Sequence, residues 1–278
     1  MSLILNDGVD ESQVRYIAVA TRGPNGVMQT APGHDGHLVV MSYTEAVMRG
    51  TVDGAAAFSS NGDYVAAGAV SDFPVHEAGE VNVSLTGAQM SFVSSSANDA
   101  AAGTGLRTLL MGYIEHSTLA AKTEIITMNG TTPVLSIATN IRFINSLTML
   151  SAGSGGRNAG AIAATNGGLT YGAMSIGHRV QASSYRMVPA GKVFVPHEII
   201  ASSNSDPVGA QAVFHIVNWS SSIPFWLPSN AIGCMDGPIV IPLKAGRMIS
   251  AGGIIGVEVT LSKGAHVTAS IIGHTENA

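Results

Sequence analysis

Apolar and polar side chains alternate along much of the chain, a pattern typical of β-strands that turn one face toward a core. The clearest example is residues 253–261, where Ile255, Val257, Val259 and Leu261 share one parity and Glu258 and Thr260 share the other. We expect the apolar set to face inward. The same criterion predicts further strands over residues 80–85, 90–94, 191–201, 211–218 and 267–272.

Two of these strands carry a histidine inside an apolar row. Strict alternation gives the rows Val193, Val195, His197, Ile199 and Val213, His215, Val217, the second of them opposite Phe214 and Ile216. A core or interface histidine satisfied by hydrogen bonds is the usual explanation. The alternative is a contact between subunits that responds to pH, because imidazole titrates near neutrality.

The central stretch, residues 103–164, contains three apolar runs, which are Arg107–Glu115, Thr123–Met128 and Ile141–Leu150. The second run ends at Asn129-Gly130, the strongest hairpin-turn signal that a sequence carries. The third run has Ile141, Phe143, Leu147 and Met149 on one parity. We therefore predict a meander of antiparallel strands, with these four side chains on one face.

Short strands at spacings of about 8–12 residues, separated by Gly- and Pro-rich turns, are typical of sandwiches and jelly rolls. We find no strand–helix–strand alternation, which counts against a parallel sheet. The prediction is an all-β, antiparallel β-sandwich or jelly-roll type of fold, built as one large sandwich or as two consecutive ones. Residues 1–73 are weakly patterned and are predicted to form an extended N-terminal arm or small subdomain. Residues 74–175 form a sandwich in this scheme, and residues 176–278 form a second one or continue the first.

Charged residues make up only 11% of the 278 residues, whereas soluble domains average roughly 25%. A free monomer with so little charge is poorly protected against association. Partner subunits are therefore expected to cover much of the surface, and a soluble β protein rich in small residues is the alternative. The net charge of −5 argues against nucleic acid as a partner, because nucleic-acid binding needs a basic stripe. We expect no membrane partner either, since no apolar stretch approaches the roughly 18–20 residues of a membrane span.

Candidate chemistry is sparse. His34, Asp35 and His37 are the only local cluster of metal-ligand types, but their spacing fits no zinc motif, and a polar turn between Gly33 and Gly36 explains them more simply. The glycine-rich segments lack the context of a phosphate loop. No serine-hydrolase elbow and no obvious carboxylate pair occur. We therefore expect no catalytic residues, no cofactor and no metal, and a protein that is not an enzyme.

Trp219, Phe225 and Trp226 form the one aromatic cluster. Such rings serve as a sugar-binding platform or as anchors of a protein interface, where aromatic side chains are enriched. Overall aromatic content is only 5%, which is low for a dedicated carbohydrate binder. Packing in a core or an interface is the preferred interpretation. Cys234, the single cysteine, is read as a small core residue.

The order GTGLRT, MNGTTPV and SAGSGGRNAGAI between Ala102 and Ile162 resembles virion structural proteins of tailed bacteriophages, especially aquatic ones. The later segments MVPAGKV, from Met187, and GPIVIPL, from Gly237, are similar to the same group. The resemblance covers residues 87–278 and implies a β scaffold without catalytic residues. This chain departs from the family pattern at residues 117–122, which are less acidic and less polar than the pattern there.

This resemblance implies a non-enzymatic component of a phage particle, assembled in the host cytoplasm and located in the virion. Within that class we expect a capsid cement or decoration protein that stabilises contacts between coat subunits. Its partners would be the major capsid protein or tail and neck proteins, and it would form a homo-oligomer. A neck, tail or fibre protein is the first alternative. A receptor- or carbohydrate-binding module that uses the two tryptophans is the second.

Overall fold

The computed structural model describes residues 21–22, 28–29, 46–47, 50, 52–204, 211–220, 223–235, 237–242 and 248–278. Its named elements are all β-strands, and all of their pairings are antiparallel. The all-β, antiparallel class predicted from the sequence is therefore confirmed. The strands are β1 Thr21–Arg22, β2 Met28–Gln29, β3 Ala56–Ala66, β4 Val70–Pro74, β5 Ser91–Ser94, β6 Leu106–Glu115, β7 Ala121–Thr127, β8 Val134–Leu135, β9 Ile141–Ala152, β10 Ile162–Asn166, β11 Leu169–Met174, β12 Arg186–Met187, β13 Lys192–Asn204, β14 Gln211–Ser220, β15 Ile223–Met235, β16 Gly237–Pro242, β17 Ile254–Leu261 and β18 Ala265–Asn277.

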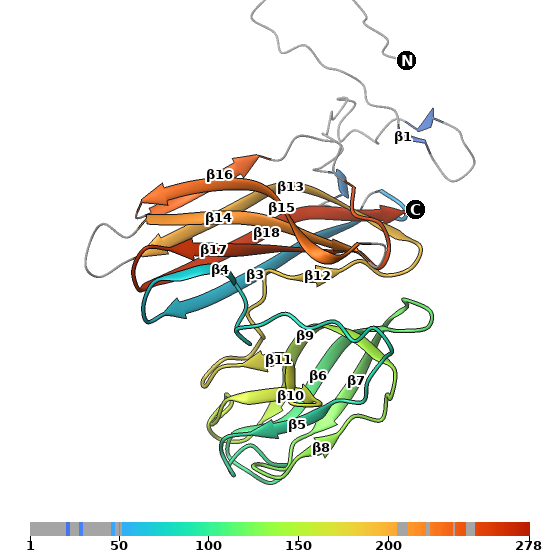
Figure 1. Ribbon diagram of the computed structural model, residues 1–278. Coiled ribbons are helices and arrows are strands. Elements are labelled where there is room, and N and C mark those ends of the chain that lie inside the picture. Colours follow the sequence, from blue (N-terminus) through green and yellow to red (C-terminus); the bar gives the residue numbers. More distant parts are fainter. Residues whose placement is uncertain are drawn as a thin grey trace, which may run out of the picture.

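Eight of these strands make two four-stranded sheets that face each other in the upper part of Figure 1. One sheet has the order β16-β13-β18-β3, and the other has the order β15-β14-β17-β4, with the short β12 also paired to β17. Strands from the two ends of the described chain thus lie side by side, β3 beside β18 and β4 beside β17. Two four-stranded sheets whose strands exchange between layers in this way form a jelly roll.

The space between the two sheets is filled with apolar side chains. The core includes Phe194, Ile199 and Ile271 from one sheet and Phe214 and Val257 from the other, all nearly inaccessible to solvent. Inward-facing residues of both sheets interdigitate in such a core. In the described part of the two sheets, the interior of the jelly roll is therefore packed with apolar side chains.

A second, smaller sandwich is inserted into the jelly roll between β4 and β12, and it forms the lower part of Figure 1. Its sheets have the orders β11-β10-β5-β8 and β7-β6-β9. A separate core, with Phe92, Leu109, Met111 and Leu147 at its centre, lies between them. The chain therefore leaves the jelly roll once, builds the inserted sandwich and returns.

The strand pairing divides the chain into domains at different residues from those that the local sequence pattern suggested. Residues 56–66 and 70–73, which the sequence analysis placed in an N-terminal arm, belong to strands of the jelly roll, because β3 pairs with β18 and β4 with β17. Local periodicity does not reveal a pairing between residues about 200 positions apart, such as Ala57 and His274. The second sandwich is consequently nested within the first.

Bulges in β13 and β9 make the observed strand faces differ from the predicted ones. In β13 the register shifts between Pro196 and Glu198, so Phe194 and Ile199 both point into the core, although strict alternation places them on opposite faces. In β9 shifts near Arg142 and Asn145 turn Phe143 away from the core that Ile141 and Leu147 share. A bulge inserts one extra residue and thereby switches the parity of everything after it.

The predicted central meander is also wrong in connectivity. The three long runs are strands, but β9 pairs with the far side of β6, and β8 lies between them in the sequence yet belongs to the opposite sheet. Residues 80–85 form no strand, and Val81 and Val83 pack as irregular chain. Asn166 begins the turn between β10 and β11, and Gly167 and Gly168 take the left-handed conformation that such a hairpin turn requires.

Candidate functional site

Two antiparallel pieces of chain connect the jelly roll to the inserted sandwich, and we call residues 75–77 and 182–184 the neck. Ser184 N–H donates to Val75 O at 3.1 Å, and Glu77 N–H donates to Ala182 O at 2.9 Å. His76 is buried in the neck, and its burial lowers its pKa to about 4. The neck is thus a hydrogen-bonded ribbon with a neutral histidine inside it.

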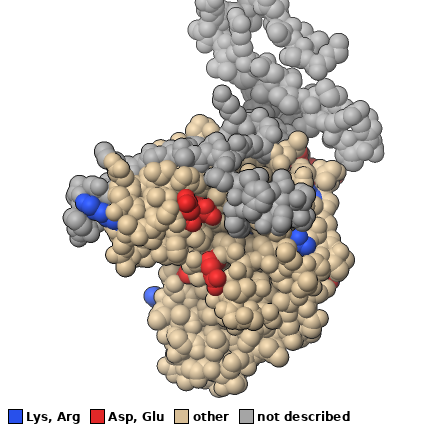
Figure 2. All heavy atoms as spheres, in the orientation of Figure 1, with Lys and Arg blue, Asp and Glu red and all other residues tan. Residues whose placement is uncertain are grey.

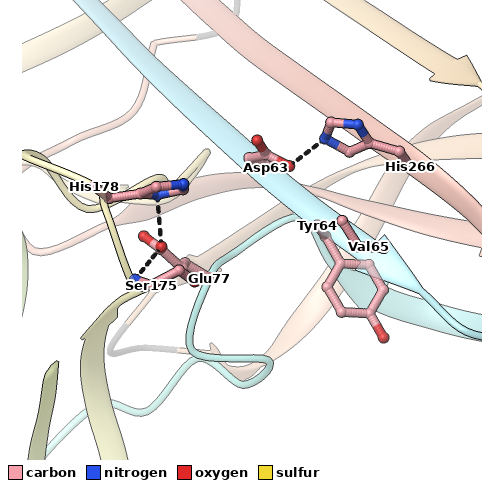
Figure 3. A pocket seen from close by; sticks show the side chains of 7 residues that line it. All are labelled: Asp63, Tyr64, Val65, Glu77, Ser175, His178 and His266. Atoms are coloured by element: carbon pink, nitrogen blue, oxygen red, sulfur yellow. Dashed lines mark hydrogen bonds and ion pairs between the residues drawn. The ribbon is translucent and has the colours of Figure 1, made fainter. Parts of the chain in front are cut away.

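A hollow of about 470 Å³ lies beside the neck, between the two sandwiches, and Figure 3 shows its walls. Asp63, Tyr64 and Val65 come from β3 and His266 from β18, so one wall belongs to the jelly roll. The opposite wall is made by Glu77 of the neck and by two residues that follow β11, Ser175 and His178.

Each wall of the hollow carries one histidine–carboxylate pair. His266 Nε2 lies 2.6 Å from Asp63 Oδ1, and His178 Nδ1 lies 2.8 Å from Glu77 Oε1. Glu77 is the better anchored carboxylate, because it also accepts hydrogen bonds from the backbone N–H groups of Ala182, at 2.8 Å, and Ser175. These contacts hold the linker that follows β11 against the neck.

The side chains of the hollow offer proton exchange and hydrogen bonding. Tyr64 stacks on Phe73 with ring centroids 4.3 Å apart, and burial raises the pKa of its phenol. No serine or cysteine of the hollow is activated by a base, since Ser175 takes part through its backbone. Within the described ranges, no three or more His, Cys, Asp or Glu side chains are placed to hold a metal ion.

A second group of titratable side chains lies on the outer face of the other sheet. Glu258 of β17 stands directly opposite His215 of β14, and His215 Nε2 lies 3.8 Å from Asp72 Oδ1. Burial, together with the charge of Asp72, raises the pKa of Glu258 to about 7. His215 therefore lies beside acidic groups on the outer face of β14, whereas Phe214 and Ile216 are in the core, so the interpretation of His215 as a core histidine is wrong.

Trp219 lies inside the seam between the two sandwiches. The seam is a third apolar cluster made by Ile114, Phe143, Tyr185, Met187, Val217, Trp219 and Ile254. Trp219 is only 6% exposed, and the guanidinium carbon of Arg142 lies 5.7 Å from the centre of its ring. Phe225 and Trp226 belong to β15, but their side chains lie outside the described residues. Of the three predicted aromatic side chains, the structure therefore describes Trp219 alone.

The remaining predicted candidates fall in different places. His34, Asp35 and His37 lie outside the described residues. His197 contacts His274 of the neighbouring strand, with Nε2 and Nδ1 2.6 Å apart, so it belongs to a histidine pair. The pKa of His197 is lowered by its burial and by the neighbouring His274.

Sequence reasoning did not find the neck or the hollow. Their residues come from four distant segments, and none of the segments carries a motif. Ser175 and His178 lie in a stretch with Gly172 and Gly177, and in the sequence this stretch resembles an ordinary turn. In the part of the chain that the structure describes, we find no helix of the length and apolarity that crossing a membrane requires.

Comparison with known proteins gives weak likenesses only. No family model matches the chain, and neither does any curated protein. A structure of infectious bursal disease virus, Gt strain, matches at a TM-score of 0.19 and 11% identity over 86% of this chain and 82% of that chain. The Gx strain matches at 0.18 and 10% over 82% and 78%, and a VP2 subviral particle of the same virus at 0.14 and 11% over 82% and 81%. TM-scores this low do not establish a common fold, so the jelly-roll assignment rests on the strand order alone.

Proposed function

We propose that this protein is a non-enzymatic structural subunit of a virus particle, in which the jelly roll packs against other subunits. The observation that carries the proposal is the strand order β16-β13-β18-β3 over β15-β14-β17-β4, interrupted once by a complete second sandwich. Jelly rolls of this kind occur in viral capsid proteins, in lectins and in cupins. The location of the polar and aromatic side chains distinguishes these three classes.

The interior of the jelly roll favours a scaffold role. A cupin needs polar ligands between its sheets, whereas the core here is apolar from Phe194 to Val259. A lectin that used Trp219 would need that ring to be exposed, and Trp219 is buried in the seam. Both observations favour a β scaffold with an apolar core, in which the outer surfaces make the contacts with other subunits.

The surface also favours burial against other subunits. Only 11% of all residues are charged, and Figure 2 shows a visible face on which Lys, Arg, Asp and Glu are few and far apart. Such a surface gives little electrostatic protection against association. A subunit that is covered in its assembly needs no such protection.

Within this class we retain the decoration or cement protein of a tailed phage as the specific role, and the sequence resemblance over residues 87–278 supports it. Its partner would be the major capsid protein, and its place the virion. A subunit that builds the shell by itself would use the same jelly roll. The two roles differ in whether the purified chain forms closed shells without any other protein.

Two measurements test the proposal. The protein should be found by mass spectrometry in particles purified through a density gradient, and cryo-electron microscopy should show the two sandwiches in fixed positions on the particle. The full-length chain, expressed alone, should then be imaged: closed shells would identify a shell subunit, and binding only to preformed capsids would identify a decoration protein. Absence from purified particles would contradict the virion role altogether.

A further inference from the structure

The strand β7 forms one edge of the inserted sandwich. Its sheet has the order β7-β6-β9, and among the described residues β6 is the only strand that pairs with β7. An edge strand presents unpaired N–H and C=O groups, which can pair with a strand of another chain. Alternate residues along β7, namely Ala121, Thr123, Ile125 and Thr127, are exposed.

The hydrogen bonds at the two ends of β7 show which backbone groups are free. Met128 N–H donates to Arg107 O at 2.9 Å, and Glu115 N–H donates to Ala120 O at 3.0 Å. In an antiparallel pair, bonded and non-bonded residues alternate. Even-numbered residues of β7 therefore point their backbone groups toward β6. The odd-numbered ones, with Thr123 in the middle, direct theirs outward.

Apolar side chains accompany this free edge. Ile125 is 59% exposed, and Ile137, whose N–H donates to Glu124 Oε1 at 2.6 Å, is 86% exposed. Of the eleven large hydrophobic side chains exposed in the described residues, eight belong to the inserted sandwich: Leu85, Ile125, Leu135, Ile137, Leu150, Leu169, Ile176 and Val180. We therefore expect the inserted sandwich, more than the jelly roll, to make the contact between copies of the chain.

We propose that β7 pairs antiparallel with β7 of a second copy of this chain, about a two-fold axis through Thr123. In this register the outward groups of Thr123 meet those of the other Thr123, and Ala121 stands opposite Ile125. A two-fold contact of this kind is self-complementary, so each favourable pair occurs twice. The exposed Ile125 side chain gains an apolar neighbour, and the outward N–H and C=O groups gain partners.

Charge selects this register. With the axis at Thr123, Lys122 of one copy stands opposite Glu124 of the other in a non-hydrogen-bonded pair, where side chains approach most closely. An axis at Lys122 would oppose two lysines, and an axis at Glu124 would oppose two glutamates. Lysine on an edge strand usually discourages pairing, but the order Lys-Thr-Glu makes this edge complementary to itself. Within one copy, Lys122 Nζ lies 2.8 Å from Glu115 Oε1 of β6, and the Glu124 carboxylate accepts hydrogen bonds from the N–H groups of Ile137 and Ala138. In the dimer these two side chains would share their charges between the two copies.

Sedimentation equilibrium of the full-length chain tests the contact through charge reversal. Lys122→Glu creates two Glu–Glu oppositions per dimer, and Glu124→Lys creates two Lys–Lys oppositions. We expect each variant alone to dimerise on the order of 10–100-fold more weakly than the unmodified chain. An equimolar mixture of the two should recover dimers, because the mixed pair contains only opposite charges. Lys263→Glu, at an exposed position outside the insert, is the matched control and should dimerise normally.

Thr123→Pro provides a variant that does not depend on charge. It removes the central outward N–H and leaves the bonds to β6 in place, so the chain should fold, with an unchanged circular dichroism spectrum, and remain a monomer. A wild-type chain that stays monomeric up to about 100 µM overturns the contact, as does a dimer that survives Thr123→Pro. The contact is argued from the strand itself, so either result leaves the virion role to its own test on purified particles.

Discussion

The ring of Tyr185 lies directly over the backbone of Gly256, so close that a Cβ atom on Gly256 would come within 2.1 Å of Tyr185 Cε1. Gly256 belongs to β17 of the jelly roll, and Tyr185 follows the neck where the chain returns from the insert. Only a residue without a side chain allows the ring to reach the sheet. The seam between the two sandwiches therefore depends on this one glycine.

The first prediction follows from that contact. Gly256→Ala should lower the free energy of unfolding by about 1–3 kcal/mol, because a Cβ atom there must displace a buried ring. Chemical denaturation measures the change. Gly68→Ala is the matched control, since no heavy atom lies within 4 Å of a Cβ at that position, and it should change stability by less than about 0.5 kcal/mol. Equal effects of the two substitutions would contradict this account of the seam.

The second prediction concerns Asp99, a fully buried carboxylate in the inserted sandwich. It accepts hydrogen bonds from Ser94 Oγ and from the backbone N–H groups of Leu106, at 2.6 Å each, and of Ala159 and Gly160, at 2.8 Å each. Asp99→Ala should cost about 3 kcal/mol or more, because it leaves several buried donors without a partner.

The loss at Asp99 should be local. Hydrogen exchange should show faster opening of the inserted sandwich, with the jelly roll largely protected. Asp53→Ala, at an exposed carboxylate, is the control and should be close to neutral. Uniform acceleration in both sandwiches would contradict a local opening of the insert.

The sequence predicted the strands better than their partners. The faces of β17 were predicted correctly, because that strand alternates without interruption between Ile255 and Leu261, and no bulge interrupts its pairing with β14. The faces of β13 and β9 were mispredicted beyond their bulges, and a bulge leaves no clear mark in an apolar run. Neither the pairing of β3 with β18 nor the neck was predictable, because they depend on contacts between residues more than 100 positions apart.

The third prediction is acid sensitivity of the neck. The folded-state pKa of His76 is lowered to about 4 by burial, from an ordinary value of 6.5. The neutral form is favoured in the fold, so its contribution to stability is fully present above pH 6.5 and is lost as the pH falls toward 4. The loss should be about 3 kcal/mol. His76→Gln should remove this part of the pH dependence in urea titrations between pH 7 and 4, and an unchanged profile would contradict it.

The fourth prediction has the opposite sign. The pKa of Glu258 is raised to about 7 from 4.5, by burial and by Asp72. The protonated form is favoured in the fold, so its contribution to stability is present below pH 4.5 and is lost as the pH rises through 7. Since the side chain is partly exposed, the effect should be about 1 kcal/mol.

Glu258→Gln isolates this contribution. Gln keeps the shape of the protonated acid and cannot ionise, so the variant should gain stability relative to the unmodified protein at pH 8 and match it near pH 4.5. The difference between the two urea midpoints, followed across pH, measures the contribution. A constant difference would mean that Glu258 does not titrate in this range.

The fifth prediction separates a structural role of Trp219 from a binding role. The side chain is buried in the seam beside Phe143 and under Arg142, so Trp219→Ala should cost about 3–5 kcal/mol. Because the seam couples the two sandwiches, calorimetry should show one transition for the unmodified chain and two for the variant. Val65→Ala, at a side chain that is 70% exposed, should leave the single transition intact. A small loss of stability together with lost glycan binding would instead favour a carbohydrate-binding module, since a ring that contributes little to packing is free to contact sugar.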